Sequence, residues 1–349
     1  MRPPMHDDDA PIIRRLDYVL AADLPDDEQE FDDELIEGVI GRAAMAVLYG
    51  DSNSGKTFVA VELAACLDLG DDWLGQRSVG GSLVLYLATE AAASVRMRFQ
   101  ARQKHHGDRL VRVVIVQSPI NLFDGRADTA AVIALVDEIE HHLHGKVQLI
   151  IGDTMARISA GANENSGEDM GVVLRNAEAI RSATSATFLW IHHTGKDQAK
   201  GMRGWSGMRA AIDTEIEVKA DDATGVRTLE ITKQRDLPGK GTRLGFKLES
   251  VPMGFNRWGT ERGSCVVVPT EAAPRKQQGR RQSEVAGAIV ELLNACAGMK
   301  KGDIVKHFAE RYDRATVYRE LKKMLEAGRL YEVAGIYALR AELKSEAAL

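Results

Sequence analysis

The segment at residues 50–57 constrains this chain more than any other part of it. Its sequence, GDSNSGKT, fits the complete G-x-x-x-x-G-K-T pattern of a phosphate-binding loop. An apolar run at residues 45–49 precedes it and a helical pattern at residues 58–67 follows it, so the motif has the strand–loop–helix setting that its chemistry needs. A chance turn rich in glycine and serine is the alternative, and the full pattern in this setting argues against it.

Each residue type in this loop suits the binding of ATP with Mg²⁺. Gly50 and Gly55 allow the backbone to turn its N–H groups toward phosphates, and the N-terminus of the following helix adds its dipole. Lys56 places a positive charge at the β- and γ-phosphates, and Thr57 offers a hydroxyl to Mg²⁺. We therefore predict that ATP binds to Gly50, Asp51, Ser52, Asn53, Ser54, Gly55, Lys56 and Thr57.

Length and charge bound the rest of the chain. Its 349 residues, 44% of them hydrophobic, are enough for two domains and a sizeable core. Residues 275–344 hold 15 Lys and Arg against 9 Asp and Glu, a charge of +6, so the remainder of a chain of net charge −6 carries −12. The basic segment indicates contact with a polyanion or, equally, a solvated linker and helix surface.

The cysteines and the N-terminus indicate a soluble, cytoplasmic protein. Cys66, Cys265 and Cys296 are widely spaced and form no C-x-x-C pair, which fits a reducing compartment rather than a disulfide framework or a zinc site. The polar N-terminus has no apolar signal segment, and no apolar run approaches membrane-spanning length. We therefore expect no membrane partner.

Four parts follow one another along the chain: an acidic arm at 1–35, a core at 36–270, a basic linker at 271–282 and a small domain at 283–340. In the core, strand-like runs alternate with helical patterns, which predicts an α/β fold with a parallel sheet covered on both faces. The last strands come without intervening helices and predict an antiparallel extension at one edge. The expected strands are 45–49, 82–88, 111–116, 148–152, 187–192, 214–219 and 228–232, and the expected helices are 58–67, 91–105, 128–142 and 167–182.

Two strand ends carry candidate catalytic carboxylates. Residues 147–153 form an apolar run that ends in Asp153, a Walker B pattern whose carboxylate would hold Mg²⁺ through water. The strand at 82–88 is followed by Thr89 and Glu90, and a carboxylate beside the phosphate-binding loop can polarise the attacking water. The alternative for Glu90 is an acid at a helix N-terminus, favoured by the helix dipole, and the residues alone leave both readings open.

Two further strand ends carry histidines and cations. His192 and His193 are adjacent on a strand and point to opposite faces, so they do not clamp one metal; one of them suits the γ-phosphate, and a packed or surface histidine is the alternative. Lys233 and Arg235 are two residues apart just past a strand, so both point the same way. The γ-phosphate of a neighbouring subunit is a suitable target, and a charged hairpin turn is the alternative.

Taken together, these segments resemble a known family. GDSNSGKT, LVLYLATE, LIIGDT, LWIHHTGKD, RGWSG at residues 203–207 and KQRDLPGKG occur in the order seen in RecA-like ATPases. They are most similar to the RepA-type plasmid hexameric replicative helicases and their phage and prophage relatives. The resemblance spans residues 35–250 and implies a RecA-like P-loop core, a ring assembly and ATP-driven work on DNA. Those compact helicases lack the acidic arm and the basic C-terminal domain.

The resemblance also implies roles for single residues. Lys56 and Thr57 bind phosphate and Mg²⁺, Asp153 holds the Mg²⁺, and Glu90 becomes the general base. His193, in preference to His192, senses the γ-phosphate.

At the subunit boundary, Lys233 and Arg235 match the K-x-R finger pair that such rings insert into the neighbour's site, and Arg203 falls in a segment that serves the interface.

The resemblance places two loops in the channel of the ring, at residues 156–169 and 194–205. Lys196, Lys200 and Arg203 in the second loop would grip the phosphates of single-stranded DNA. The first loop carries one arginine and several acids, which argues against DNA contact there.

The C-terminal domain reads as three short helices, at residues 284–296, 302–311 and 314–327, followed by a hairpin of 330–333 and 336–339. This order is a winged-helix pattern, and RATVYRELKKMLEAG is similar to its recognition helices.

Asp313 caps the third helix and Gly328 ends it. Its buried stripe would be Val317, Leu321, Met324 and Leu325, which leaves Thr316, Arg319, Lys322 and Lys323 exposed to meet duplex DNA. A protein-binding winged helix is the alternative.

From these features we predict a RecA-like, hexameric, DNA-dependent ATPase of a plasmid, phage or mobile-element replication system that acts as a DNA helicase. A non-translocating regulator, whose ATP state controls assembly and whose winged helix carries specificity, is the alternative of another class. A recombination-mediator ATPase is a third. Directional strand displacement on a forked duplex distinguishes the helicase from both.

Overall fold

The computed structural model forms two compact units, residues 1–273 and 274–349, each described by itself below. Most of the predicted acidic arm and basic linker lies outside the described residues. These residues are 20–21, 33–107, 111–124, 126–194, 202, 204–274, 284–296 and 298–340.

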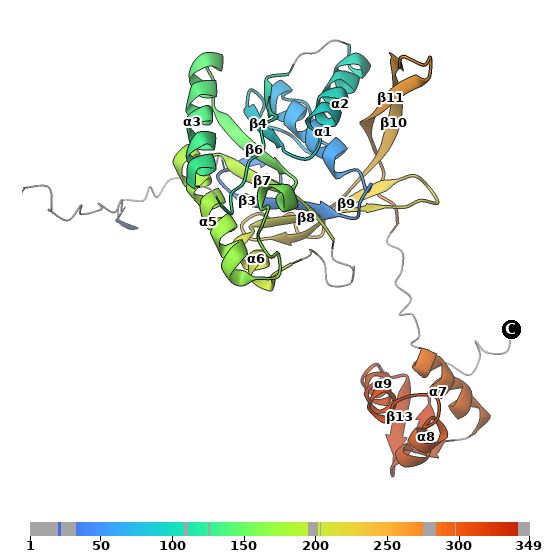
Figure 1. Ribbon diagram of the computed structural model, residues 1–349. Coiled ribbons are helices and arrows are strands. Elements are labelled where there is room, and N and C mark those ends of the chain that lie inside the picture. Colours follow the sequence, from blue (N-terminus) through green and yellow to red (C-terminus); the bar gives the residue numbers. More distant parts are fainter. Residues whose placement is uncertain are drawn as a thin grey trace, which may run out of the picture. The chain divides into compact units, whose positions relative to one another are not determined.

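The first unit is built on a nine-stranded sheet (Figure 1). Its strands are β3 (Met45–Gly50), β4 (Leu83–Ala88), β5 (Val113–Val116), β6 (Val147–Asp153), β7 (Thr187–His193), β8 (Thr214–Ala220), β9 (Arg227–Gln234), β10 (Arg243–Phe255) and β11 (Glu261–Thr270). They lie in the order β11-β10-β9-β8-β3-β7-β6-β4-β5. The six strands from β8 to β5 are parallel, and β9, β10 and β11 extend the sheet in antiparallel fashion.

This topology confirms the predicted RecA-like α/β class. Strand β7 is inserted between β3, which leads into the phosphate-binding loop, and β6, which ends in Asp153. The antiparallel extension at one edge is also confirmed. Strands β10 and β11 were not predicted, because Gly245, Pro252 and Gly254 interrupt the first pattern and Pro269 lies in the second. Proline is tolerated in β11 because it is an edge strand.

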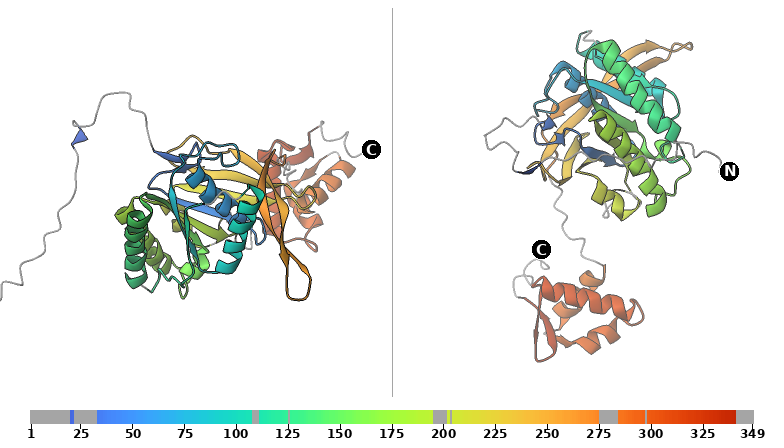
Figure 2. Two further views of the ribbon diagram at one scale, coloured as in Figure 1. Left: turned by 90° about the horizontal axis from the view of Figure 1, so that it is seen from above. Right: turned by 90° about the vertical axis from the view of Figure 1, so that its left-hand side faces the viewer.

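Helices cover both faces of the sheet (Figure 2). On one face lie α1 (Lys56–Leu69) and α2 (Ala92–His105), and their apolar side chains join one buried cluster. The other face is covered by α3 (Arg126–Leu143), α4 (Met155–Ile158), α5 (Gly167–Thr184) and α6 (Ser206–Ala211). The four long helices agree with the predicted ones, whereas the short α4 and α6 carry too few residues to show a helical period in the sequence.

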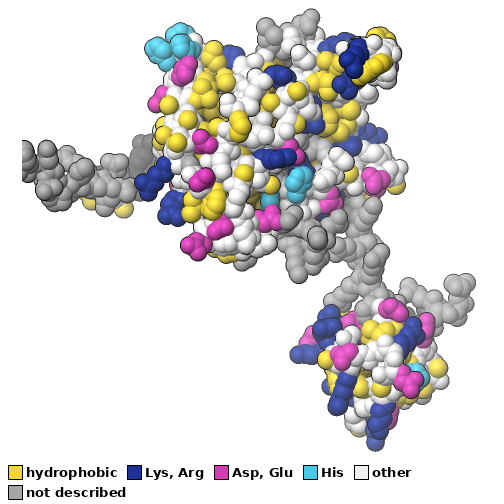
Figure 3. Space-filling model, in the orientation of Figure 1, with side chains coloured by type: hydrophobic (Ala, Val, Ile, Leu, Met, Phe, Trp, Pro, Cys, Tyr) yellow, Lys and Arg dark blue, Asp and Glu magenta, His cyan; other side chains and the backbone are white. Residues whose placement is uncertain are grey.

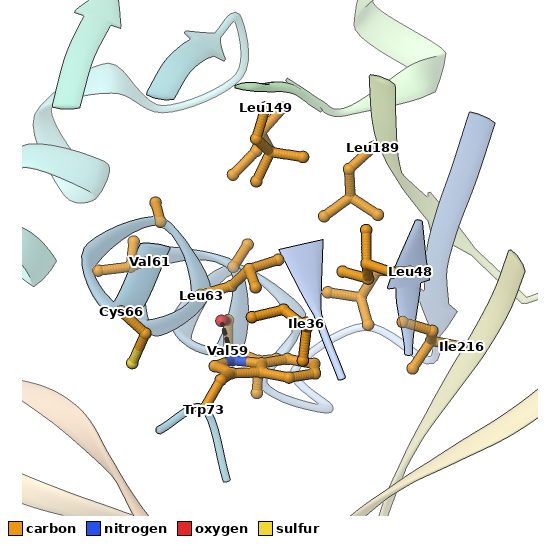
Figure 4. Close-up of a cluster of buried hydrophobic side chains, with 14 of the residues drawn as sticks. Ile36, Leu48, Val59, Val61, Leu63, Cys66, Trp73, Leu149, Leu189 and Ile216 are labelled. Atoms are coloured by element: carbon orange, nitrogen blue, oxygen red, sulfur yellow. Dashed lines mark hydrogen bonds between the residues drawn. The ribbon is translucent and has the colours of Figure 1, made fainter. Parts of the chain in front are cut away.

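The cluster beneath α1 fixes the position of the phosphate-binding loop (Figure 4). All six residues of β3 are buried, and the indole Nε1–H of Trp73 donates a hydrogen bond to the carbonyl of Val59 at 3.4 Å. A small hairpin of β1 (Glu34–Ile36) and β2 (Ile40–Gly41) covers this cluster with buried Leu35 and Ile36. Residues near 35, which we placed at the end of the arm, therefore belong to the packed core.

The second unit has its own core. It contains α7 (Glu284–Ala295), α8 (Lys301–His307) and α9 (Arg314–Glu326), with a three-stranded sheet of β12 (Met299–Lys300), β13 (Leu330–Val333) and β14 (Ile336–Leu339) in the order β12-β14-β13. The predicted order of three helices and a hairpin is present, but β12 was not predicted and α8 ends at His307. The side chain of Asp313 accepts hydrogen bonds from the backbone of Ala315 and Thr316, which confirms it as the cap of α9.

Candidate active site

Most of the predicted site residues lie where four parallel strands, β3, β4, β6 and β7, end. The carboxyl ends of these strands form one edge of the sheet. Gly50 at the end of β3 pairs in register with His193 at the end of β7. Ala88 at the end of β4 pairs with Asp153 at the end of β6. Glu90 comes two residues after Ala88 and therefore lies near Asp153. Ligands of open α/β sheets bind outside this edge.

The loop between β3 and α1 has the shape of a phosphate cradle. A side chain at Gly50 would lie 2.4 Å from the carbonyl oxygen of Val218, and Gly55 has a φ of 103°, so both positions need glycine. The Lys56 ammonium donates hydrogen bonds to the carbonyl oxygens of Gly50 at 3.0 Å and Asp51 at 2.7 Å. The side chain thus lies over the loop, where the phosphates of a nucleotide would lie. These features fit a nucleotide.

Burial and nearby carboxylates act on the pKa of Lys56 in opposite directions. Burial lowers the pKa of its ammonium to about 8, whereas the negative charges of Asp153, Asp51 and Glu90 raise it. A phosphate group at this position would stabilise the charged form in the same way as these carboxylates do. The site therefore favours an anionic ligand.

Asp153 is 5% exposed and held by three hydroxyl groups. Tyr86 Oη donates to its Oδ2 at 2.7 Å, Thr57 makes a second side-chain hydrogen bond, and Thr89 Oγ1 donates to its carbonyl at 3.0 Å. Burial raises the pKa of the Asp153 carboxyl, and the bonds from Tyr86 and Thr57 lower it. Thr57 and Asp153 together offer the hydroxyl and carboxylate oxygens that suit Mg²⁺ beside a nucleotide.

Glu90 lies in the turn between β4 and α2, and its side chain is exposed. Its negative charge raises the pKa of both Lys56 and Asp153, so its carboxylate faces the same site. An exposed carboxylate at this edge has access to water and to the γ-phosphate position.

The two histidines at the end of β7 have different surroundings. His192 is 3% exposed and points to the face that contains buried Phe188 and Trp190. His193 is only partly buried and points to the face of α1, level with Gly50. Of the two, His193 is the one placed beside the phosphate-binding loop.

Lys233 and Arg235 lie at the opposite end of the parallel strands, beside the start of β8. Arg235 donates hydrogen bonds of 2.6 Å to Asp213 Oδ1 and to the carbonyl of Ala210, and the Lys233 ammonium binds the carbonyl of Ile212. Both side chains therefore hold the C-terminal end of α6. Strand register places them near the start of β8, whereas the phosphate-binding loop lies beside its end, so the pair is not part of the chain's own site.

A buried acid lies next to this pair. Glu215 pairs with Lys233 in register, and its Oε1 lies 3.0 Å from Nε of Arg209. Burial raises the pKa of Glu215, and the charges of Arg209 and Lys233 lower it. The finger pair and α6 thus belong to one polar cluster.

The two predicted channel loops contact each other. Trp205 N–H donates a hydrogen bond to the carbonyl of Glu164 at 2.9 Å. Gly204, with a φ of 106°, lies where the two loops approach each other. The first loop is shorter than predicted, because α4 contains its start and α5 begins at Gly167 after the Ser166 cap. Lys196, Lys200 and Arg203 lie outside the described residues.

Three residues near the site were missed in the sequence. The sequence predicts Tyr86 only as part of an apolar strand. Its hydroxyl, the one polar group in the run LVLYLA and two residues before the strand ends, could have indicated a polar contact. The guanidinium of Arg98 lies 4.3 Å from the centre of the Phe58 ring, and its charge lowers the pKa of Asp153. Arg227 packs against Gly55: a Cβ atom at Gly55 would lie 3.0 Å from Cδ of Arg227. Neither arginine stands in a pattern that the sequence reveals.

The C-terminal unit presents basic side chains on α9. Arg319, Lys322 and Lys323 are exposed, as predicted, and Figure 3 shows dark blue side chains on this unit. Lys322 and Lys323 pair within the helix with Glu326 and Glu320, both at 3.8 Å. Such exposed pairs are weak and leave the lysines available to a polyanion.

Comparison with known proteins assigns a family. A family model described as an AAA domain matches residues 10–199, more than half of the chain. No curated protein matches the chain. A crystal structure of the RadB recombinase is similar, with a TM-score of 0.44 and 14% identity over 60% of this chain and 88% of that chain. Among the described residues, no helix has the length and apolarity to cross a membrane. The chain belongs to the AAA domain family of P-loop ATPases.

Proposed function

We propose that the chain is an ATP-hydrolysing, ring-forming motor that works on DNA, and that it is a DNA helicase of the RepA type. The observation that carries this proposal is that two groups of predicted site residues lie at opposite ends of the parallel strands. The phosphate-binding loop, Asp153 and Glu90 lie where these strands end, and Lys233 and Arg235 lie where β8 begins. A cation pair so placed is suited to the site of a neighbouring copy in a ring.

The chain's own residues divide the chemistry among them. Backbone N–H groups of the loop and Lys56 bind the phosphates, and Glu90 accepts the proton of the attacking water. Thr57 and Asp153 would hold Mg²⁺, which supplies charge neutralisation at the phosphates when bound. Tyr86 fixes the orientation of Asp153 through its hydrogen bond.

His193 supports a link between the nucleotide and DNA. It ends β7, level with Gly50, and the second predicted channel loop begins in the sequence at the next residue, Thr194. A histidine that contacts the γ-phosphate would therefore shift the start of this loop when the phosphate leaves. We propose that single-stranded DNA lies against this loop in the channel of a hexamer of a plasmid, phage or mobile-element replication system.

The C-terminal unit is proposed to be a winged-helix domain that binds duplex DNA. Its three helices and hairpin have the order of that fold, and α9, capped by Asp313, carries exposed cations on one face. In this proposal α9 enters the major groove.

Three measurements test the proposed motor. The purified chain should hydrolyse ATP faster with single-stranded DNA, and should displace a strand from a forked duplex in one direction only. Negative-stain images with an ATP analogue and DNA should show rings. Stimulation without strand displacement would contradict the helicase assignment.

Glu90→Gln tests the chemistry within the same site. It should bind ATP normally and lose turnover, because only water activation is removed, whereas Lys56→Ala should lose both. Glu249→Gln, an exposed carboxylate on β10, is the matched control and should keep full activity. Hydrolysis by Glu90→Gln at the wild-type rate would show that Glu90 is not the general base.

A non-translocating regulator is the second candidate. The observation that favours it is the separate C-terminal unit with its own apolar core, which is suited to carry DNA specificity by itself. A regulator of this kind would bind one duplex sequence preferentially and would change its assembly, but not its position on DNA, with the nucleotide.

A further inference from the structure

The hairpin of β10 and β11 ends in a tip at residues 254–262 with two large side chains in solvent. Phe255 is 75% exposed and Trp258 is 72% exposed, the highest values among the exposed large hydrophobic residues of the described chain. Figure 3 shows hydrophobic and basic side chains next to each other at this end of the first unit. The functions argued above use neither residue.

The tip is closed by its own hydrogen bonds. Asn256 N–H donates to the carbonyl of Thr260 at 2.9 Å, and Asn256 Oδ1 accepts from the backbone N–H groups of Trp258 at 2.9 Å and Thr260 at 3.0 Å. The turn is thus ordered before any ligand arrives, and binding costs little additional conformational entropy.

The stem of the hairpin is anchored to helix α2. Val251 and Val266 pack with Ala101 of that helix in a small buried cluster. The Lys104 ammonium donates a 2.7 Å hydrogen bond to the carbonyl of Pro252, just before the tip. The exposed rings therefore stand on a supported stem.

The charge around the tip is positive. The guanidinium of Arg257 lies 4.0 Å from the centre of the Trp258 ring, and exposed Arg262 follows on β11, with Glu261 as the acid among residues 252–263. Helix α2, which supports the stem, has the sequence AASVRMRFQARQKH and contains no Asp or Glu. An apolar protein partner would not require these cations.

We propose that this tip is a second contact for single-stranded DNA, outside the predicted channel loops. Trp258 stacks on an unpaired base, Phe255 offers a second apolar surface, and Arg257 and Arg262 face the neighbouring phosphates. Aromatic rings flanked by cations bind single strands in this way without sequence preference. A duplex is a poor ligand for the tip, because its base faces are stacked inside the helix.

Binding of the full chain to a labelled oligo(dT) without nucleotide, followed by fluorescence anisotropy, tests this proposal. Trp258→Ala and Arg257→Gln should each weaken binding, the first about tenfold, since that is within the range that one stacked base contributes. Glu261→Gln should strengthen binding by removing an anion. Leu143→Ala, which changes an exposed apolar residue on α3, is the matched control and should leave the affinity unchanged.

Tryptophan fluorescence gives a local reading of the same contact. The chain has four tryptophans, of which Trp73 and Trp190 are buried. Quenching by oligo(dT) should be smaller in Trp258→Phe than in the wild type, because only Trp205 then remains near a proposed DNA contact. The contribution of Trp258 should persist in Trp205→Phe, which lacks the tryptophan of the predicted channel loop.

Two results would overturn the proposal. The first is oligo(dT) affinity of Trp258→Ala equal to that of the wild type. An altered oligomeric state of this variant by light scattering would then assign the tip to contacts between copies. The second is absence of oligo(dT) binding by the wild type. ATP hydrolysis measured without DNA then judges the proposed ATPase independently.

Discussion

The hydroxyl of Tyr86 donates a 2.7 Å hydrogen bond to Oδ2 of Asp153, and both side chains are buried. This bond joins the middle of β4 to the end of β6, across the two neighbouring strands that carry the proposed general base and the proposed Mg²⁺ ligand. It fixes one oxygen of the carboxylate and lowers the pKa of Asp153, which burial raises. The bond thereby orients the Asp153 carboxylate and opposes the rise in its pKa that burial causes.

Tyr86→Phe should therefore raise the Mg²⁺ concentration needed for half-maximal ATP hydrolysis by about tenfold, the lower end of the usual cost of losing such a supporting bond. Turnover at saturating Mg²⁺ should change little, because no reacting group is removed. Since an ionised Asp153 is needed and the variant raises its pKa further, activity should also be lost at a higher pH as the pH falls. Mg²⁺ titrations at several pH values measure both effects.

Tyr49→Phe is the control for this variant. Its hydroxyl lies 3.2 Å from Thr232 Oγ1 on the other face of the sheet and does not contact Asp153. Its Mg²⁺ requirement should equal that of the wild type. An equal shift in both variants would mean that Tyr86 acts only through general stability.

Lys56 makes ATP binding depend on pH. Its pKa of about 8 in the free protein is set by burial, and bound phosphates would raise it, so binding favours the protonated form. Affinity should be constant below about pH 8 and should fall by about tenfold per pH unit above it, as a proton must be taken up with the nucleotide. Calorimetric titration across this range measures the decline.

Lys56→Arg separates this effect from other titrations. Its side chain remains charged throughout, so whatever affinity it retains should not fall above pH 8. A decline as steep as that of the wild type would assign the pH dependence to another group.

The C-terminal unit should fold by itself. A fragment that begins near Gln282 contains the complete apolar core of this unit and should bind duplex DNA with an affinity that falls steeply with salt. Changing Arg319, Lys322 and Lys323 to Ala should reduce the salt slope by up to roughly 0.9 for each lost phosphate contact. Circular dichroism should remain unchanged, because these side chains lie off the buried stripe.

Lys306→Ala, an exposed change on α8, is the control for this fragment and should keep the full slope. Absence of duplex binding even at low salt would make the unit a protein-docking module.

The sequence was most informative where local chemistry determines structure. The glycines of the phosphate-binding loop, the Asp153 strand end and the Asp313 cap each follow from a short pattern with one physical explanation, and the structure places all of them as expected. The alternation of strands and helices likewise predicted the parallel part of the sheet.

The rest depends on contacts between distant segments. Tyr86 meets Asp153 across 67 residues, and Arg227 reaches Gly55 from a strand that is not adjacent to β3 in the sheet. Strands β10 and β11 pair with each other although glycine and proline weaken their local patterns. No single segment contains the information that creates these contacts, because pairing and packing decide them.

Subunit mixing tests the central claim, that Lys233 and Arg235 complete the site of a neighbouring copy. Arg235→Ala and Lys56→Ala should each be nearly inactive alone. In mixed rings, some interfaces combine an intact phosphate-binding loop with an intact cation pair, so ATP hydrolysis should return when the two proteins are mixed. Persistent inactivity of the mixture, with subunit exchange shown by fluorescence energy transfer, would contradict the account.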